Sequence, residues 1–265
     1  MKDLFEDIMN KESFEVQDNL HPKFWAVENI LHPEISKRLV EIAQDFLDGL
    51  DIEVELKDLR LTGSLAAFNW SAYSDIDLHL VVDFDIIDED IEFVRDYFNA
   101  KIFVWNNQHN ITVHNFEVEI YVENENEPHK SLGVYSIMNN EWIKKPIREE
   151  ADIDWDEVEK KATSLMGQVN AISQLLKDEK YKEVHDSTLR LKEKIKRFRR
   201  TGLDKAGVYS SENVAFKVLR RNGYLSRLSL LKTTAYDKLM SIKGGGITIK
   251  LQETVKNWKN YLKGD

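Results

Sequence analysis

Cysteine is absent from this chain of 265 residues, and so is any long apolar run. The lack of cysteine excludes a disulfide framework, a thiolate zinc site and a cysteine nucleophile, and it favours a reducing compartment. The N-terminal residues are acidic and lack the apolar core of a signal peptide, and no apolar run approaches the roughly 18 residues that span a bilayer. The sequence therefore predicts a soluble, cytoplasmic protein that does not insert into a membrane.

Charge is distributed unevenly along the chain, whose formal net charge is −10. Residues 1–150 contain 13 Lys and Arg against 32 Asp and Glu, and residues 151–265 contain 24 against 15. The two parts therefore carry net charges of −19 and +9. An acidic part that collects cations, followed by a basic part, suits an enzyme that acts on polyanions. Simple attraction between the two parts explains the asymmetry equally well.

Hydrophobic periodicity predicts a mixed α/β region over residues 1–150. An amphipathic helix is predicted at 33–49, with Pro33 in its first turn and Gly49 at its end. Alternating apolar residues predict strands at about 57–62 and 76–83. The other elements predicted here are a short helix at 65–70, a helix at 88–104, a hairpin with arms 111–113 and 116–122, and an extended pair at 134–138 and 142–143.

Helical patterns dominate from residue 153 onward. Two apolar seams of period 3.5 between Val158 and Phe198 predict two helices that pack as an antiparallel hairpin. Shorter helices are predicted at 211–222 and 225–241, and a glycine triple at 244–246 is predicted to break the chain. The sequence thus predicts an α+β protein, with a mixed sheet and flanking helices over residues 1–150 and an all-α, basic domain over residues 151–265.

The stretch that says most about chemistry runs from residue 61 to residue 78. Gly63-Ser64 is followed by ten residues and then by Asp75-Ile76-Asp77. In a strand, Asp75 and Asp77 project from the same face, and a carboxylate pair that stays ionised there is most simply explained by a bound divalent cation. Hard oxygen ligands favour Mg²⁺ or Mn²⁺. Free backbone N–H groups at Gly63-Ser64, before the predicted short helix, suit a phosphate.

A third carboxylate is expected from the second arm of the hairpin. Glu117 and Glu119 lie two residues apart in Phe-Glu-Val-Glu-Ile-Tyr-Val, so they share a face of that strand. A glutamate within an otherwise apolar strand is costly to bury unless it is paired or bound to a metal. Three acids from two neighbouring strands can hold two Mg²⁺ ions about 4 Å apart. His79, on the same face as Asp77, is interpreted as a hydrogen-bonded structural histidine rather than a substrate contact.

These residues together resemble the signature of the DNA polymerase β-like nucleotidyltransferases. That signature has an apolar residue, Gly-Ser, a spacer of about this length, Asp-x-Asp within a strand and a later acid flanked by apolar residues. The resemblance implies that Gly63 and Ser64 hold the phosphates of a nucleoside triphosphate (NTP), and that Asp75 and Asp77 bind two metal ions. It implies that the third acid either binds the catalytic metal or deprotonates the acceptor hydroxyl. Glu119 fits that position best, in Val-Glu-Ile, and the neighbouring Glu117 stays the alternative.

Basic residues of the helical part supply the remaining candidate contacts. The segment 192–227 is rich in Lys and Arg, and part of it is expected to meet a triphosphate or the backbone of RNA or another nucleic acid. In many related enzymes a helical domain after the catalytic sheet touches the base and the triphosphate. By that analogy the candidate substrate contacts are Lys205, Lys217, Arg220 and Arg221.

The leading hypothesis is an enzyme that transfers a nucleoside monophosphate from an NTP to an acceptor hydroxyl and releases pyrophosphate. The acceptor is expected to be a nucleic-acid 3′ end first, then a second nucleotide, a protein side chain or a small molecule. The competing hypothesis is a catalytically silent module of the same fold that binds a nucleotide or RNA. The presence of Gly63, Ser64, Asp75 and Asp77 argues against silence, because loss of one carboxylate is the simplest route to an inactive site.

Overall fold

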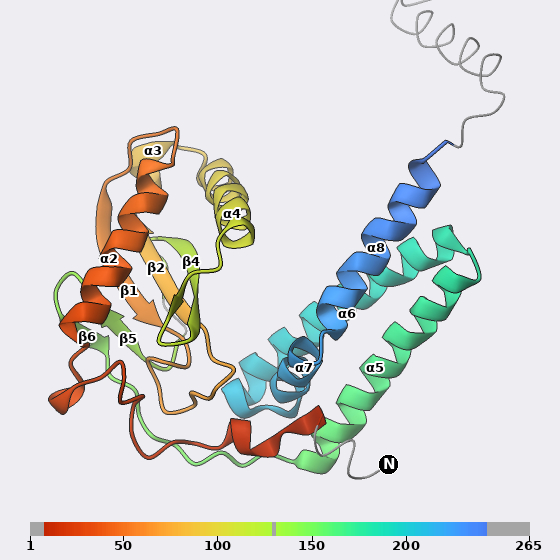
Figure 1. Cartoon of the computed structure of the whole chain (residues 1–265), viewed down its shortest axis with the longest axis horizontal. Coiled ribbons are helices and arrows are strands. Elements are labelled where there is room, and N and C mark those ends of the chain that lie inside the picture. The colour runs from red at the N-terminus through yellow and green to blue at the C-terminus, as the bar shows by residue number, and fades with distance from the viewer. Residues whose placement is uncertain (1–7, 129–130, 243–265) are drawn as a thin grey trace, which may run out of the picture. The chain divides into compact units, whose positions relative to one another are not determined.

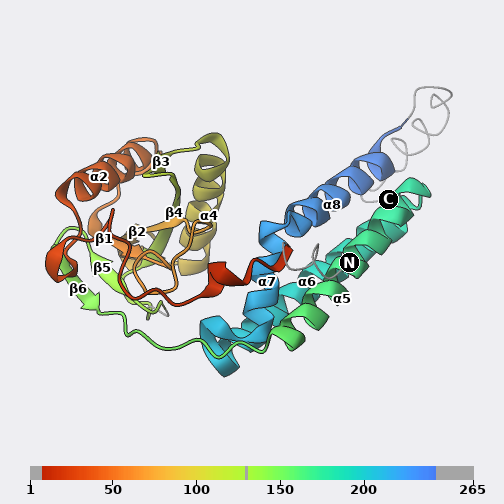
Figure 2. The same cartoon turned by 60° about the horizontal axis from the view of Figure 1, so that its bottom comes forward.

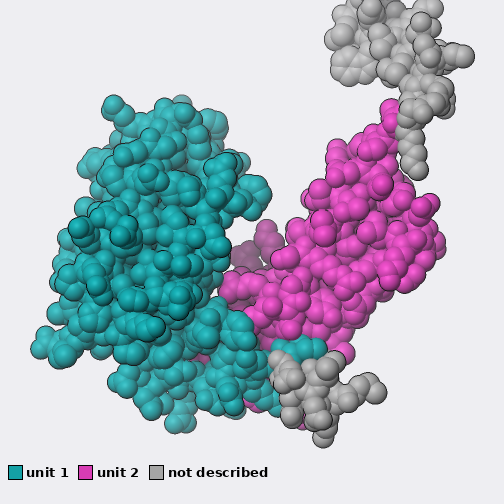
Figure 3. Space-filling model, viewed as in Figure 1, with its two compact units in different colours: residues 1–153 teal, residues 154–265 magenta. Residues whose placement is uncertain are grey.

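Two compact units make up the chain, Met1–Ile153 and Asp154–Asp265 (Figures 1 and 3). A computed structural model describes residues 8–128 and 131–242 of them. The first unit is an α+β structure built on a six-stranded mixed sheet, and the second is helical throughout its described part.

In the first unit, helices separate two of the strands that pair in parallel in the sheet. Helix α2 (Pro33–Asp48) precedes the strands β1 (Leu56–Thr62) and β2 (Ile76–Val82). Helices α3 (Phe84–Ile87) and α4 (Ile91–Gln108) connect β2 to the hairpin of β3 (Thr112–Val113) and β4 (Phe116–Asn124). The last strands are β5 (Val134–Ser136) and β6 (Glu141–Lys144), and short 3₁₀ turns occupy Lys11–Phe14 and Val27–Asn29.

The strand order in the sheet is β3-β4-β2-β1-β5-β6. Strand β2 pairs antiparallel with β1 and parallel with β4, which makes the sheet mixed. The parallel pairing needs the long connection through α3 and α4, because a tight hairpin joins only antiparallel strands. In this register Asp77 of β2 lies opposite Glu119 of β4 and opposite Thr62 of β1.

The two faces of the central strands differ in polarity. Leu61, Leu78 and Ile120 are fully buried on one face, in a core that they share with the apolar side of α2. Helix α4 joins the same core, where Trp105 meets Phe46 of α2 edge to face with ring centroids 5.6 Å apart. Because side chains alternate along a strand, the intervening positions place the acids of the candidate site on the opposite face.

The prediction of a short helix at 65–70 is wrong, because these residues form a turn and a bend that lead into irregular backbone. Their carbonyl groups bond to distant parts of the chain instead of to the next helical turn. Leu65 O accepts a hydrogen bond from the Trp25 indole at 2.8 Å, and Phe68 O accepts one from Gln17 N at 2.7 Å. A segment of this length forms a helix only with support from its surroundings, because helix nucleation is unfavourable.

The helix predicted at 88–104 is shifted along the chain. Helix α4 begins at Ile91, because Asp90 caps it by accepting a hydrogen bond from Phe93 N at 3.1 Å. Asp88 in turn accepts from Asp90 N at 2.9 Å, which keeps the preceding residues out of the helix. The other helices and strands predicted for this unit are confirmed, with their ends shifted by a few residues.

The second unit begins with the predicted antiparallel hairpin. Helices α5 (Trp155–Lys177) and α6 (Tyr181–Ala206) are joined by the turn at 178–180 and lie side by side (Figures 1 and 2). Helices α7 (Ser211–Arg221) and α8 (Tyr224–Met240) follow, and both pack against α6. The predicted glycine break at 244–246 lies outside the described residues. Within the described ranges, no helix combines the length and the apolar character that crossing a bilayer needs.

The close packing of α6 on the start of α7 predicts opposite effects for two glycine substitutions. A Cβ at Gly202 would lie 2.5 Å from Glu212 Cβ and 2.7 Å from Ser210 Oγ. We expect Gly202→Ala to lower the Tm, because overpacking costs about 1–3 kcal/mol and outweighs the helix propensity gained, about 1 kcal/mol. Gly167→Ala in α5 should raise the Tm, because a Cβ there meets no atom within 4 Å. Thermal melts followed by circular dichroism measure both, and a raised Tm for Gly202→Ala would contradict this packing.

Candidate metal centre

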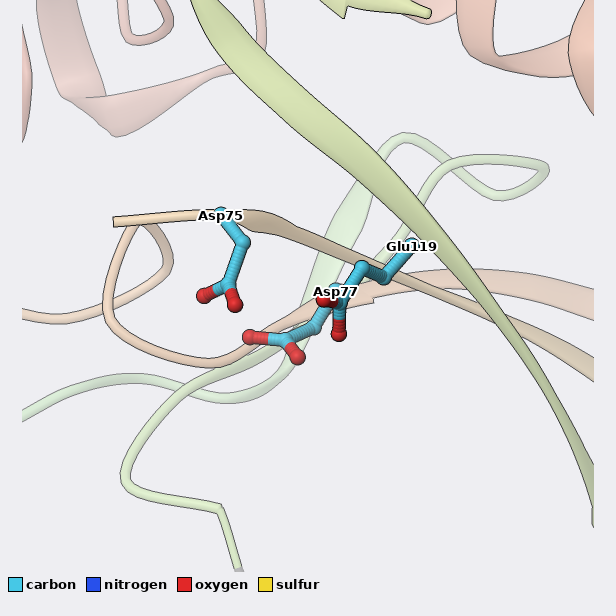
Figure 4. Close-up of side chains that lie close together, drawn as sticks. All are labelled: Asp75, Asp77 and Glu119. Carbon is cyan, nitrogen blue, oxygen red and sulfur yellow. The ribbon is translucent and has the colours of Figure 1, made fainter. Parts of the chain in front are cut away.

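Three carboxylates meet where β2 begins. Asp75 comes directly before β2, Asp77 is the second residue of that strand, and Glu119 lies opposite Asp77 on β4. One carboxylate oxygen from each residue lies within 4.8 Å of the other two. Figure 4 shows the three side chains converging from the two neighbouring strands. All three residues are half-buried, so the cluster is shielded in part from water.

The cluster brings like charges together. At this distance the repulsion between two ionised carboxylates is about 1 kcal/mol in water, and it grows as the surroundings become less polar. A cation placed between the oxygens removes the repulsion, and the three acids can hold a metal ion. The strand register of the sheet therefore creates a cluster of acids that can hold a cation.

The backbone at Gly63 packs directly against the Asp77 carboxylate of this cluster. It follows β1 with a φ of +73°, a conformation that residues with a Cβ rarely adopt. A Cβ at Gly63 would lie only 1.7 Å from Asp77 Oδ2. Glycine is thus required for two reasons, the left-handed turn and the room that the Asp77 carboxylate needs.

Ser64 ties the turn after β1 to the residues before Asp75. The Ser64 hydroxyl donates to Ser74 Oγ at 2.7 Å, and Ser74 Oγ also accepts from Ser71 N at 3.0 Å. These bonds close the ten-residue spacer into a loop. Gly63-Ser64 and Asp75 are therefore neighbours in space as well as parts of one motif.

Tyr121 orients Glu119 from the next position on the same face of β4. The Tyr121 hydroxyl donates to Glu119 Oε2 at 2.5 Å. Burial, followed by the bond to Glu119, raises the pKa of Tyr121 above its ordinary value, so the phenol stays a neutral donor. The His79 ring stacks on Tyr121, with centroids 4.9 Å apart, and limits how far the phenol can move.

A charged network across β1, β2 and β4 holds His79. Its Nδ1 lies 3.1 Å from Glu123 Oε2, and Arg60 Nη1 donates to Glu123 Oε1 at 2.9 Å. Arg60 Nε also donates to the buried Asp58, at 3.0 Å. His79 is thus hydrogen-bonded within the sheet, in agreement with its interpretation as a structural histidine. The network stabilises the face of the sheet that carries the acids.

Not all of the predicted site residues come together. Glu117 is exposed and does not belong to the cluster, so the geometry favours Glu119 as the third acid. The basic candidates belong to the second unit. Lys205 is exposed in the last turn of α6, whereas the other three are spaced to share one side of α7: Lys217, Arg220 and Arg221.

Sequence reasoning did not identify two contributors to the site, Tyr121 and the N-terminal segment around Trp25. A signal for Tyr121 existed, because strand alternation places it on the same face as Glu119. No local signal existed for Trp25, whose bond to Leu65 O joins residues 40 positions apart.

No family model matches the chain, and no curated protein or solved structure matches it either. The chemistry of the site is therefore inferred from its own residues and geometry.

The contact between Gly63 and Asp77 predicts that Gly63→Ala weakens Mn²⁺ binding, because the added Cβ would displace the carboxylate. Gly223→Ala is the matched control. The φ angle is +73° at both glycines, but a Cβ at Gly223 meets no atom within 4 Å. Both variants carry a similar backbone strain of roughly 1–2 kcal/mol, so only Gly63→Ala should change the affinity. Isothermal titration with Mn²⁺ measures it, and equal losses in both variants would contradict the contact.

The two glutamates of β4 should differ in the same titration. We expect Glu119→Gln to weaken Mn²⁺ binding about tenfold or more, because it removes a ligand charge and keeps the side-chain shape. Glu117→Gln changes an exposed position of the same strand and should stay within about twofold of the wild type. Equal losses would assign both acids to the site, and the reverse order would make Glu117 the third ligand.

Proposed function

We propose that the protein is a metal-dependent nucleotidyltransferase of the DNA polymerase β-like type. The observation that carries the proposal is the cluster of Asp75, Asp77 and Glu119 with the Gly63 backbone packed against Asp77. The signature in the sequence concerns residue types and spacing, and the cluster adds that these residues meet in space. A mixed sheet flanked by helices is compatible with the fold that the resemblance implies.

The proposed cofactor is Mg²⁺ or Mn²⁺, as two ions held by Asp75, Asp77 and Glu119. Carboxylate oxygens are hard ligands, which suit these cations better than softer metals. When bound, the ions supply charge neutralisation for the triphosphate and activation of the acceptor hydroxyl.

The residues of the chain orient the reactants in this proposal. The turn at Gly63-Ser64 offers backbone N–H groups to the phosphates of the NTP, next to the Asp77 carboxylate. Glu119, oriented by Tyr121, either completes the metal site or accepts the proton of the acceptor hydroxyl. The acceptor oxygen forms a bond to the α-phosphorus, the bond from that phosphorus to the leaving oxygen breaks, and pyrophosphate departs.

A nucleic-acid 3′ end is the acceptor that we propose first, followed by a second nucleotide. The support is electrostatic, since residues 151–265 carry a net charge of +9. The residues proposed to contact the triphosphate or RNA are Lys205, Lys217, Arg220 and Arg221.

Nucleotide transfer by the full chain tests the proposal. With Mg²⁺, label should pass from at least one of the four α-³²P-labelled NTPs to RNA or to a nucleotide, and pyrophosphate should be released. Asp75→Asn and Asp77→Asn should each slow the transfer about a hundredfold or more, the scale on which loss of one electrostatic partner acts in other enzymes. Without metal, both variants should melt at the wild-type temperature or above it, because a repulsive charge is gone.

The control variant is Asp45→Asn, which removes an exposed acid from α2 and should leave the rate unchanged. Wild-type turnover in the Asp75 or Asp77 variant would place the chemistry elsewhere. NTP binding without turnover on any acceptor would indicate a silent binding module.

A further inference from the structure

The helical unit contains a cavity of its own, lined by α6, α7 and α8. Its volume is about 280 Å³. Apolar side chains of Phe216, Leu225 and Leu228 form one part of the lining. Cationic side chains of α6 form another part, and the lining residues in the described chain include no acid. The cavity therefore combines an apolar wall with an excess of positive charge, which suits an anionic ligand with an apolar body.

The three cations of the lining are Lys192, Lys196 and Arg199. Their spacing of four and three residues places them on one side of α6. They extend over about 10 Å of the helix axis, at 1.5 Å per residue. One carboxylate cannot reach three charges over this distance, whereas a di- or triphosphate, or successive phosphates of a strand, can. The spacing thus selects a phosphate-bearing ligand.

Two of these cations are positioned by other side chains of the same unit. The Arg199 guanidinium carbon lies 4.3 Å from the centroid of the Phe216 ring, and Arg199 Nε donates to Asn213 Oδ1 at 3.2 Å. Lys192 Nζ donates to Ser229 Oγ at 3.1 Å. Aromatic rings and guanidinium planes are the surfaces on which nucleobases stack. Charges that are already positioned also lose less side-chain entropy when a ligand binds.

We propose that this cavity binds a nucleotide, with its base against Phe216, Leu225 and Leu228 and its phosphates against Lys192, Lys196 and Arg199. An inorganic phosphate would leave the apolar wall uncovered, and a fatty acid would leave most of the positive charge unmatched. The volume lies near the lower end for ligand pockets, so it accommodates a base while the phosphates stay at the charged side. The nucleotide is either free or part of a single-stranded RNA.

This site is independent of the proposed catalysis, because none of its residues belongs to the acidic cluster. Its Lys and Arg side chains bind the phosphates directly, so that no metal ion is needed. The two proposals can therefore fail separately. EDTA removes metal-dependent binding, and variants of the lining residues then separate the cavity from the other cations of the helical unit. Mn²⁺ titration and nucleotide transfer examine the acidic cluster.

Titrations of the full chain in EDTA with AMP, ATP, tripolyphosphate and a six-nucleotide oligoadenylate test the proposal. The double variant Lys192→Ala/Lys196→Ala should weaken ATP binding about tenfold or more, the loss expected when charge-assisted bonds are removed. Arg190→Ala/Arg197→Ala is the matched control, because it removes the same charge from the opposite, exposed side of α6. It should stay within about twofold of the wild type.

A second pair of variants tests the apolar wall. Ser229→Phe should block the apolar part of the cavity and weaken ATP binding more than tripolyphosphate binding, which loses only the Ser229 partner of Lys192. Leu230→Phe, at the exposed neighbouring position, should change neither. Saturation-transfer NMR should show stronger transfer to the adenine protons than to the ribose protons. Thermal melts check that each variant is folded. If Lys192→Ala/Lys196→Ala has a lower Tm than the wild type, Lys196→Glu, at an exposed position, takes its place in the titrations.

The outcomes separate the sources of the nucleotide. Tighter binding of oligoadenylate than of AMP and ATP, with the same variant effects, identifies an RNA strand, and the reverse order identifies a free nucleotide. The proposal is overturned if no nucleotide binds, if tripolyphosphate binds as tightly as ATP and Ser229→Phe has no effect, or if both double variants lose affinity equally.

Discussion

The parallel pairing of β2 with β4 is the constraint on which the acidic site depends. This register places Asp77 opposite Glu119 and His79 opposite Tyr121, so the third acid and the phenol that orients it arrive together. A hairpin between the same strands would reverse the direction of β4 and separate these pairs. Parallel strands need a crossover connection, which α3 and α4 supply. The crossover through α3 and α4, with α4 packed against the apolar face of the sheet, therefore allows the acids to meet on the opposite face.

Core burial outweighs the repulsion that this arrangement creates. Each large apolar side chain that the central strands bury, such as Leu78 or Ile120, contributes about 1.5–3 kcal/mol, whereas each carboxylate pair costs about 1 kcal/mol at this distance in water. Burial of the apolar face thus offsets the repulsion among the three acids on the opposite face. The hydrogen bond from Tyr121 to Glu119 and the network around His79 hold side chains in place on this face, where the carboxylates repel one another.

The helical unit concentrates charge of the opposite sign by a simpler route. Helical spacing places Lys192, Lys196 and Arg199 on one side of α6, and the close approach at Gly202 lets α7 pack beside that helix. Phe216 of α7 then contacts the guanidinium of Arg199, an exposed residue that also lines the cavity. In the first unit, the strand register places acidic side chains next to one another. In the second unit, helix periodicity places basic side chains on one side of α6, beside an apolar wall.

The sequence by itself determined the elements and the position of the acidic motif. Apolar periodicity predicted α2, β1, β2, β4 and the α5–α6 hairpin, because these patterns depend on neighbours within a few residues. The choice between Glu117 and Glu119 stayed open in the sequence, since both share a face of β4, and the register with β2 brings Glu119 next to Asp75 and Asp77. The turn at 65–70, the bond of Trp25 to that turn and the cavity of the helical unit were decided only by tertiary structure. The physical reason is that these features need contacts between residues far apart in the chain, whose distances arise from packing and not from local pattern.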